Sequence, residues 1–130
     1  EVAEFAQRIC KTHPSFGLLV DQAHMTLLEE KTEHCLGVLK EFLVHAHLGN
    51  CVMKHPEHEA YGDNHPRFGI PEGENGLEEL VEFLAGLNGI GYFEGPKKPL
   101  SFELKPCSGE STEEIIIESA GLLDTAWSQA

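Results

Sequence analysis

Residues 43–49 read LVHAHLG, and this stretch decides the fold class. It is too short for a helix, and its alternation with a period of two predicts a β-strand. His45 and His47 then lie on one face of the strand, and Val44, Ala46 and Leu48 lie on the other. The pattern therefore predicts a strand that carries both histidines on a single side.

Two further stretches have the character of strands. FGLLVD at residues 16–21 is a short, continuous apolar run that ends in a carboxylate, which is typical of a buried parallel strand. LSFELK at residues 100–105 alternates apolar with polar side chains. The sequence therefore predicts three strands.

Helical spacing of apolar residues marks the segments between these strands. The predicted helices are residues 1–12, 29–42, 77–87 and 111–127. The last two begin with pairs that resemble capping boxes, Asn75 with Glu78 and Ser111 with Glu114. The apolar residues at helical spacing are Val2, Phe5, Ala6, Ile9 and Cys10, then Cys35, Leu36, Leu39 and Phe42, then Leu77, Leu80, Val81, Leu84 and Leu87, and the last helix is expected to bury Ile116, Ala120, Leu123 and Trp127.

The order of these elements is α-βα-βα-βα. Strands that alternate with helices imply parallel pairing through right-handed crossovers, with helices on one or both faces of the sheet. The predicted fold class is therefore α/β, with three parallel strands flanked by helices. At 130 residues the chain is expected to be one domain, residues 1–130.

Charge limits the partners of this chain. Twenty-two acidic residues against nine basic ones give a formal net charge of −13, which repels phosphate backbones and anionic lipid surfaces. Nucleic-acid and membrane partners are therefore not expected, and no apolar run approaches the roughly 20 residues that cross a bilayer. The four cysteines are widely spaced without a CxxC motif, and no signal peptide is evident. Reduced thiols and a cytoplasmic location are expected.

The connection after the second predicted strand is about 25 residues long, which is unusual in a compact domain unless the loop is functional. It contains YGDNHPRFGIPEGENG at residues 61–76. Asp63 and His65 are separated by one residue, so a turn of the backbone could direct both side chains to one point. The loop glycines permit the backbone angles that such a turn needs. An acidic, flexible surface loop is the alternative.

Polar residues at the carboxyl ends of the strands are the candidate site, because chemistry in parallel α/β folds gathers there. The candidates are Asp21, His24, His47, Asp63, His65 and Glu103. Taken singly, each has an ordinary explanation, such as a helix cap for Asp21. Together they supply the mixed nitrogen and oxygen donors that Zn²⁺, Mn²⁺ or Co²⁺ accept. His45 shares a face with His47 and is expected to support it or to belong to the core.

Four motifs in this order, LLVDQAHM, LVHAHLGN, YGDNHPRFG and SFELKP, resemble the C-terminal half of the xylose isomerase-like TIM barrels. That superfamily includes sugar phosphate isomerases and epimerases and the apurinic-site endonucleases of family 2. The resemblance covers nearly the whole chain and implies a partial barrel that corresponds to strands six to eight. It also implies that the first five strands, and the metal-bound glutamate they carry, are absent here.

The resemblance implies roles for the candidate residues. Asp21, His47 and Glu103 would bind the central divalent metal, which could be Zn, Mn, Co or Mg. Glu103 and His24 would be catalytic, with Glu103 as the base and His24 facing the substrate. In the endonuclease branch His24, Asp63 and His65 would bind an additional zinc, whereas in the isomerase branch they would touch the sugar.

The expected function is metal-dependent isomerisation or epimerisation of a small sugar or sugar phosphate, by proton transfer next to a carbonyl. The alternatives are a metal-dependent phosphodiesterase of the apurinic-site endonuclease kind, and a half barrel or fragment that binds metal without turnover. Because three strands leave a barrel interior uncovered, a homodimer is also expected.

Overall fold

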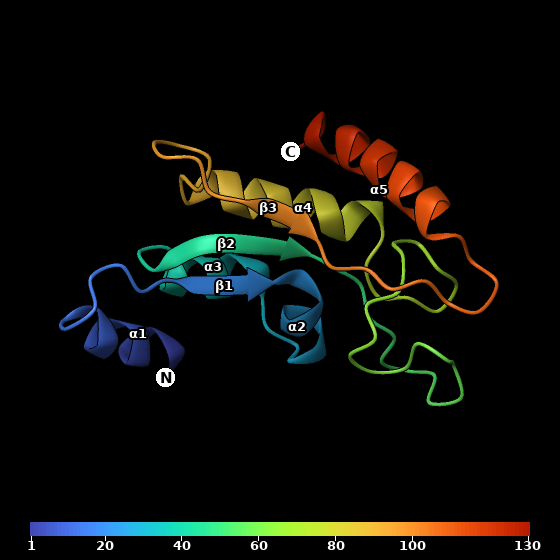
Figure 1. Ribbon diagram of the computed structural model, residues 1–130, viewed down its shortest axis with the longest axis horizontal. Helices are drawn as coiled ribbons and strands as arrows, with labels where there is room; N and C mark the ends of the chain where they lie inside the picture. Colours follow the sequence, from blue (N-terminus) through green and yellow to red (C-terminus); the bar gives the residue numbers. More distant parts are fainter.

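The computed structural model describes residues 1–130 and contains one parallel three-stranded sheet (Figure 1). Its strands are β1 (Leu18–Asp21), β2 (Leu43–Leu48) and β3 (Leu100–Phe102), in the spatial order β1-β2-β3. The prediction of an α/β fold with three parallel strands is confirmed. Strand β3 is shorter than the predicted 100–105, so that Glu103 follows the strand instead of lying within it.

Five helices accompany the sheet. They are α1 (Val2–Cys10), α2 (Gln22–Leu27), α3 (Thr32–Leu39), α4 (Leu77–Gly89) and α5 (Thr112–Trp127). Helix α2 was not predicted from the sequence. It forms because the Asp21 carboxylate accepts hydrogen bonds from two N–H groups of its first turn. None of the five has both the length and the apolar character needed to cross a bilayer.

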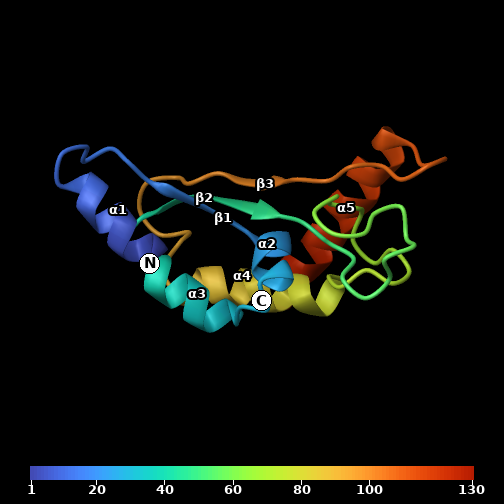
Figure 2. The same cartoon turned by 90° about the horizontal axis from the view of Figure 1, so that it is seen from below.

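The helices cover only one face of the sheet. Figure 2 shows α3 and α4 lying along one side and no helix over the other. Val20, Ala46 and Leu48 are at most 4% exposed and join the core on the helix side. Since side chains alternate along a strand, Asp21 and His47 point to the opposite face, which we call the open face.

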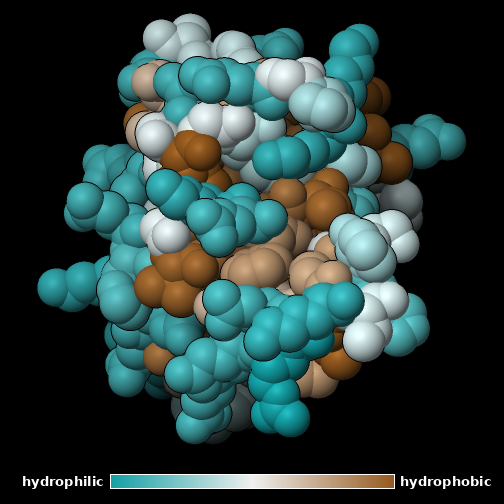
Figure 3. All heavy atoms as spheres, turned by 90° about the vertical axis from the view of Figure 1, so that its left-hand side faces the viewer, coloured by the Kyte–Doolittle hydropathy of each residue, from teal (hydrophilic) through white to brown (hydrophobic).

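Apolar side chains remain exposed on the open face and around the start of the sheet. Leu19, the neighbour of Val20, is 47% exposed, and Val44 is 48% exposed. The predicted first helix is present as α1, which exposes Val2 and Phe5 and buries only Ala6 of its apolar residues. Figure 3, a view of the side where the strands begin, shows apolar atoms gathered in the middle of the surface. The sheet therefore lacks cover on one side.

Two details of the predicted helices were wrong. Helix α4 is capped by Gly76, whose N–H donates to Glu79 Oε2 at 2.8 Å, so Asn75 and Glu78 do not form a capping box.

Helix α5 buries Ile115, and Ile116 is 59% exposed. Trp127 is 52% exposed, and its ring packs against Phe93 at 4.8 Å between centroids. The buried residues of α5 are Ile115, Ser119 and Ala126. The predicted cap at Ser111 is present, because its Oγ accepts the N–H of Glu114.

Candidate metal centre

Asp21 ends β1 and is the residue around which the site is built. Its Oδ1 accepts the N–H groups of Ala23 at 2.7 Å and His24 at 3.2 Å, which caps helix α2. Its other oxygen, Oδ2, is buried and has no hydrogen-bond partner. Capping of α2 therefore explains the position of Oδ1 but not the burial of Oδ2, because a buried carboxylate oxygen without a partner destabilises the fold.

A first group of possible metal ligands, Asp21, His47 and Glu103, lies at the ends of the three strands. Asp21 is opposite His47 in the register of β1 and β2, and the N–H of Glu103 donates to Leu48 O at 2.9 Å just beyond β3. His47 Nδ1 lies 2.5 Å from Glu103 Oε2 and 3.4 Å from Asp21 Oδ2. Each of these three residues has one possible metal-ligand atom, and these three atoms lie within 4.8 Å of one another, as ligands of one ion require.

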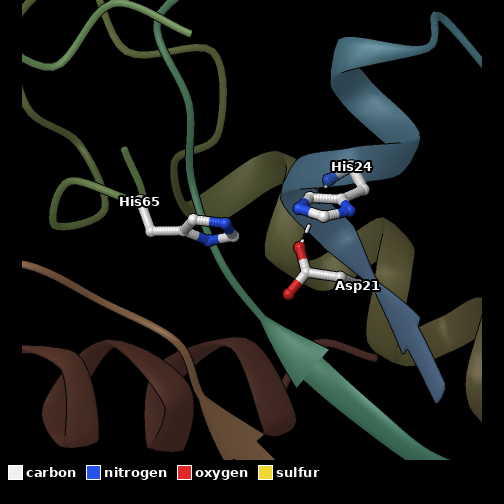
Figure 4. Close-up of side chains that lie close together, drawn as sticks. All are labelled: Asp21, His24 and His65. Carbon is white, nitrogen blue, oxygen red and sulfur yellow. Dashed lines mark hydrogen bonds between the residues drawn. The ribbon is translucent and has the colours of Figure 1, made fainter. Parts of the chain in front are cut away.

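A second group shares Asp21 with the first. Asp21, His24 and His65 also bring donor atoms within 4.8 Å of one another, and Figure 4 shows the two imidazoles beside the carboxylate. Asp63 Oδ1 lies 2.9 Å from His24 Nε2 and 2.7 Å from His65 Nε2. The two residues expected to converge from the loop, Asp63 and His65, therefore do meet at one point, together with His24.

The loop that carries Asp63 and His65 is anchored to the rest of the protein by buried residues and hydrogen bonds. Asn50 is fully buried, and its Oδ1 accepts the N–H groups of Cys51 and Asn75 while its Nδ2 donates to Arg67 O. His65 is 7% exposed with φ of 47°, a strained backbone conformation of the kind found at functional sites. The N–H of Lys105 donates to His65 O at 2.7 Å and ties the loop to the segment after β3.

Gly49 and Asn50 were not singled out in the sequence, although both determine the site. A Cβ atom on Gly49 would lie 2.9 Å from His65 Nδ1 and 3.4 Å from Asp21 Oδ1. Only a glycine leaves room for these two side chains to approach each other. The available signal was the pair Gly49-Asn50 directly after the strand LVHAHL, because a strand followed by such a pair turns sharply into its loop.

The pKa values of Asp21 and Glu103 are shifted in opposite directions. Burial raises the pKa of Asp21 above its ordinary value, and the nearby carboxyl of Glu103 raises it further. The hydrogen bond with His47 lowers the pKa of Glu103, although partial burial opposes this. A cation at Asp21 Oδ2 would relieve the unfavourable burial of the charge, so the residues present fit a divalent metal ion.

The predicted site residues are therefore all brought to one end of the sheet. His45 precedes His47 by two residues on β2. Its Nε2 lies 2.8 Å from Ser101 Oγ, and its ring makes an edge contact with the ring of His47, at 4.7 Å between centroids. The remaining orphaned atom of the site is His65 Nδ1, which is buried beside Gly49 without a partner.

No known protein-family model matches the chain, and no curated protein matches its sequence. The resemblance to xylose isomerase-like barrels therefore remains a prediction from short sequence motifs.

Proposed function

We propose that this chain is a metal-dependent isomerase or epimerase of small sugars or sugar phosphates, with its site at the carboxyl ends of the three strands. The observation that carries the proposal is the buried Asp21 Oδ2, which lacks a hydrogen bond and lies beside His47 and Glu103. The chain would then be a partial TIM barrel in which these strands correspond to the last three.

Asp21, His47 and Glu103 would hold the ion. Imidazole nitrogen and carboxylate oxygen are donors that Zn²⁺, Mn²⁺ and Co²⁺ all accept, and Mg²⁺ accepts the carboxylates. A divalent ion would polarise a substrate carbonyl and make the hydrogen on the neighbouring carbon more acidic.

The exposed side chains of the site would handle the substrate. Glu103 is 47% exposed and lies beside the proposed ion, so it is the group placed to take a proton from a small hydroxy-carbonyl compound. His24 is 53% exposed and is held by Asp63, so it would orient a substrate oxygen or donate a proton to it. His65 is buried and would only hold Asp63 in position.

Charge supports a small substrate over a nucleic acid. Residues 51–82 contain eight Asp or Glu and two Lys or Arg, so the loop beside the site repels a phosphate backbone. A phosphodiesterase is nevertheless a second candidate, because Asp21, His24 and His65 form a second group whose ligand atoms lie within 4.8 Å of one another, where a second cation could bind. Metal binding without turnover is the third.

Calorimetry with Zn²⁺ and Mn²⁺ tests the metal site. Asp21→Asn and His47→Ala should weaken binding by at least about tenfold, because each removes one of three ligands. His34→Ala is the control, since His34 is exposed on α3 and belongs to neither group of clustered side chains. Equal binding by the wild-type and His47→Ala proteins would exclude the proposed site.

Solvent exchange tests the reaction. The metal-loaded chain is incubated in D₂O with a set of aldoses, ketoses and their phosphates, and NMR measures deuterium at the carbon next to the carbonyl. We expect exchange that depends on Glu103 and is lost in Glu103→Gln. Cleavage of abasic DNA that depends on His65, without any sugar exchange, would favour the phosphodiesterase. Metal binding with neither activity would favour a non-catalytic role.

A further inference from the structure

A second polar hollow lies on the other side of α2 from the strand-end site. It has a volume of about 550 Å³ and opens between the α2–α3 segment and the start of α4. Its walls carry six glutamates, which are Glu29, Glu30, Glu33, Glu74, Glu79 and Glu82. We call it the acidic hollow.

Little positive charge balances these carboxylates. Lys31 is the only basic residue that lines the acidic hollow, and Lys54, which reaches it from the loop, is already paired with Glu74 at 2.7 Å. With six carboxylates around it, the hollow concentrates the negative potential of a chain whose net charge is −13. A cation is therefore the ligand that the electrostatics favours.

Gln22 provides an independent sign of a ligand. It is one of the residues that line the acidic hollow, it is only 4% exposed, and its side chain makes no hydrogen bond within the protein. Its Oε1 is buried without any partner. An amide oxygen of this kind accepts a hydrogen bond, and an N–H donor from a ligand would satisfy it.

The spacing of the carboxylates argues against a metal ion. Both groups of side chains that are close enough to share an ion lie at the strand ends, and neither includes a glutamate of the acidic hollow. Carboxylates spread around a cavity of this size suit an extended cation with several N–H groups along its length. Methylene spacers between those groups could pack against Met25, the only hydrophobic residue of the lining.

We infer that the acidic hollow binds a linear polyamine, with ammonium groups on its glutamates and one N–H on Gln22. This site is separate from the proposed metal centre, so neither proposal depends on the other.

Titration calorimetry with spermidine at low ionic strength tests the inference. Glu33→Gln/Glu82→Gln removes two charges from the hollow and should weaken binding about tenfold, the combined effect of two exposed ion pairs. Glu113→Gln/Glu118→Gln removes two exposed charges from α5 and should change the affinity less than about twofold, since it leaves the hollow intact. Glu79 is left unchanged because it caps α4.

Gln22→Met tests the hydrogen bond, because it keeps the length of the side chain and removes the amide. We expect weaker spermidine binding with an unchanged circular dichroism spectrum. If this variant does not fold, backbone NMR of the wild-type chain replaces it, with spermidine shifting residues 22–33 and 74–82 and not residues 112–127. His47→Ala should bind spermidine as the wild type does.

Three results would overturn the inference. Equal weakening by the two double variants would show attraction to net charge alone. Folded Gln22→Met with wild-type affinity would remove the amide from the site. Displacement of spermidine by Mg²⁺ at equal concentration would indicate a metal site instead.

Discussion

Gly49 is the residue whose size most tightly controls the strand-end site. An added Cβ would lie 2.9 Å from His65 Nδ1 and 3.3 Å from Ala23 Cβ, closer than these buried atoms allow. We expect Gly49→Ala to lower the free energy of unfolding by about 1–3 kcal/mol, as overpacking does, and to weaken metal binding. Urea unfolding and metal calorimetry measure the two effects.

Gly37→Ala is the matched control. Gly37 lies in helix α3, and a Cβ there would meet nothing within 4 Å. Alanine in a helix is more stable than glycine by about 0.5–1 kcal/mol, so this variant should be at least as stable as the wild type. A Gly49→Ala protein with wild-type stability and metal affinity would show that the space around His65 is not tight.

Helix α5 carries isoleucines on more than one of its faces, and only one of these faces is buried. Residues 115–117 are three consecutive isoleucines, of which Ile115 is 4% exposed and Ile116 and Ile117 are 59% and 71% exposed. Ile115→Ala should therefore lower the free energy of unfolding by about 2–4 kcal/mol, because it leaves a cavity in a packed site. Ile116→Ala should change it by less than about 0.5 kcal/mol. Urea unfolding of the two variants decides between the faces, and a larger effect at Ile116 would contradict the structure.

The segment before α5 is joined to the long loop by an ion pair. Glu110 Oε1 accepts from Arg67 Nε at 2.6 Å, and its Oε2 accepts the N–H of Cys107 at 2.8 Å. The Cys107 N–H and then Arg67 lower the pKa of Glu110 from its usual 4.5. A carboxyl with a lowered folded-state pKa stabilises the fold above pH 4.5, and this contribution is lost as the pH falls through the folded value.

We therefore expect Glu110→Gln to be less stable than the wild type by about 1–2 kcal/mol at pH 7, since charged hydrogen bonds contribute about that much. The difference should begin to shrink below pH 4.5, where the carboxyl of the unfolded chain becomes neutral, and should be lost as the pH falls through the lower folded-state pKa. Thermal unfolding between about pH 3 and pH 7 measures the stability difference and its change with pH. Glu118→Gln, at an exposed position, is the control. A stability difference that does not change with pH would mean that Glu110 acts through packing alone.

At the scale of the whole molecule, the sheet has an open face and two unpaired edges. Parallel sheets are normally covered on both faces, and unpaired edges readily accept another strand. We expect a homodimer in which two copies bury this face, including Leu19, in an interface of more than about 1,000 Å². Because each copy has a net charge of −13, dimerisation should strengthen as added salt screens the repulsion.

Light scattering at micromolar concentration measures this assembly. Leu19→Lys places a charge on the open face and should shift the chain toward the monomer. Ile117→Lys, at a more exposed position on α5, should leave the assembly unchanged. A wild-type chain that stays monomeric at high salt would refute the expected dimer.

The sequence alone determined the three strands, four of the five helices and the composition of the site. The short runs FGLLVD, LVHAHLG and LSFELK have the patterns of strands, and parallel strands direct their carboxyl ends to one edge. That is why Asp21, His47 and Glu103 were expected near one another before their positions were known. Asp63 and His65 followed from a loop too long to lack a role.

The tertiary structure decided what local patterns leave open. Periodicity cannot choose among three adjacent isoleucines, and only burial in the folded chain distinguishes Ile115 from the other two. It cannot show which oxygen of Asp21 caps α2 and which remains free, because that depends on where α2 and the loop lie in space. Nor can it reveal that Gly49 must lack a side chain, since the contact is with His65, sixteen residues away along the chain. Side-chain periodicity is local, whereas burial and close approach are set by segments distant in sequence.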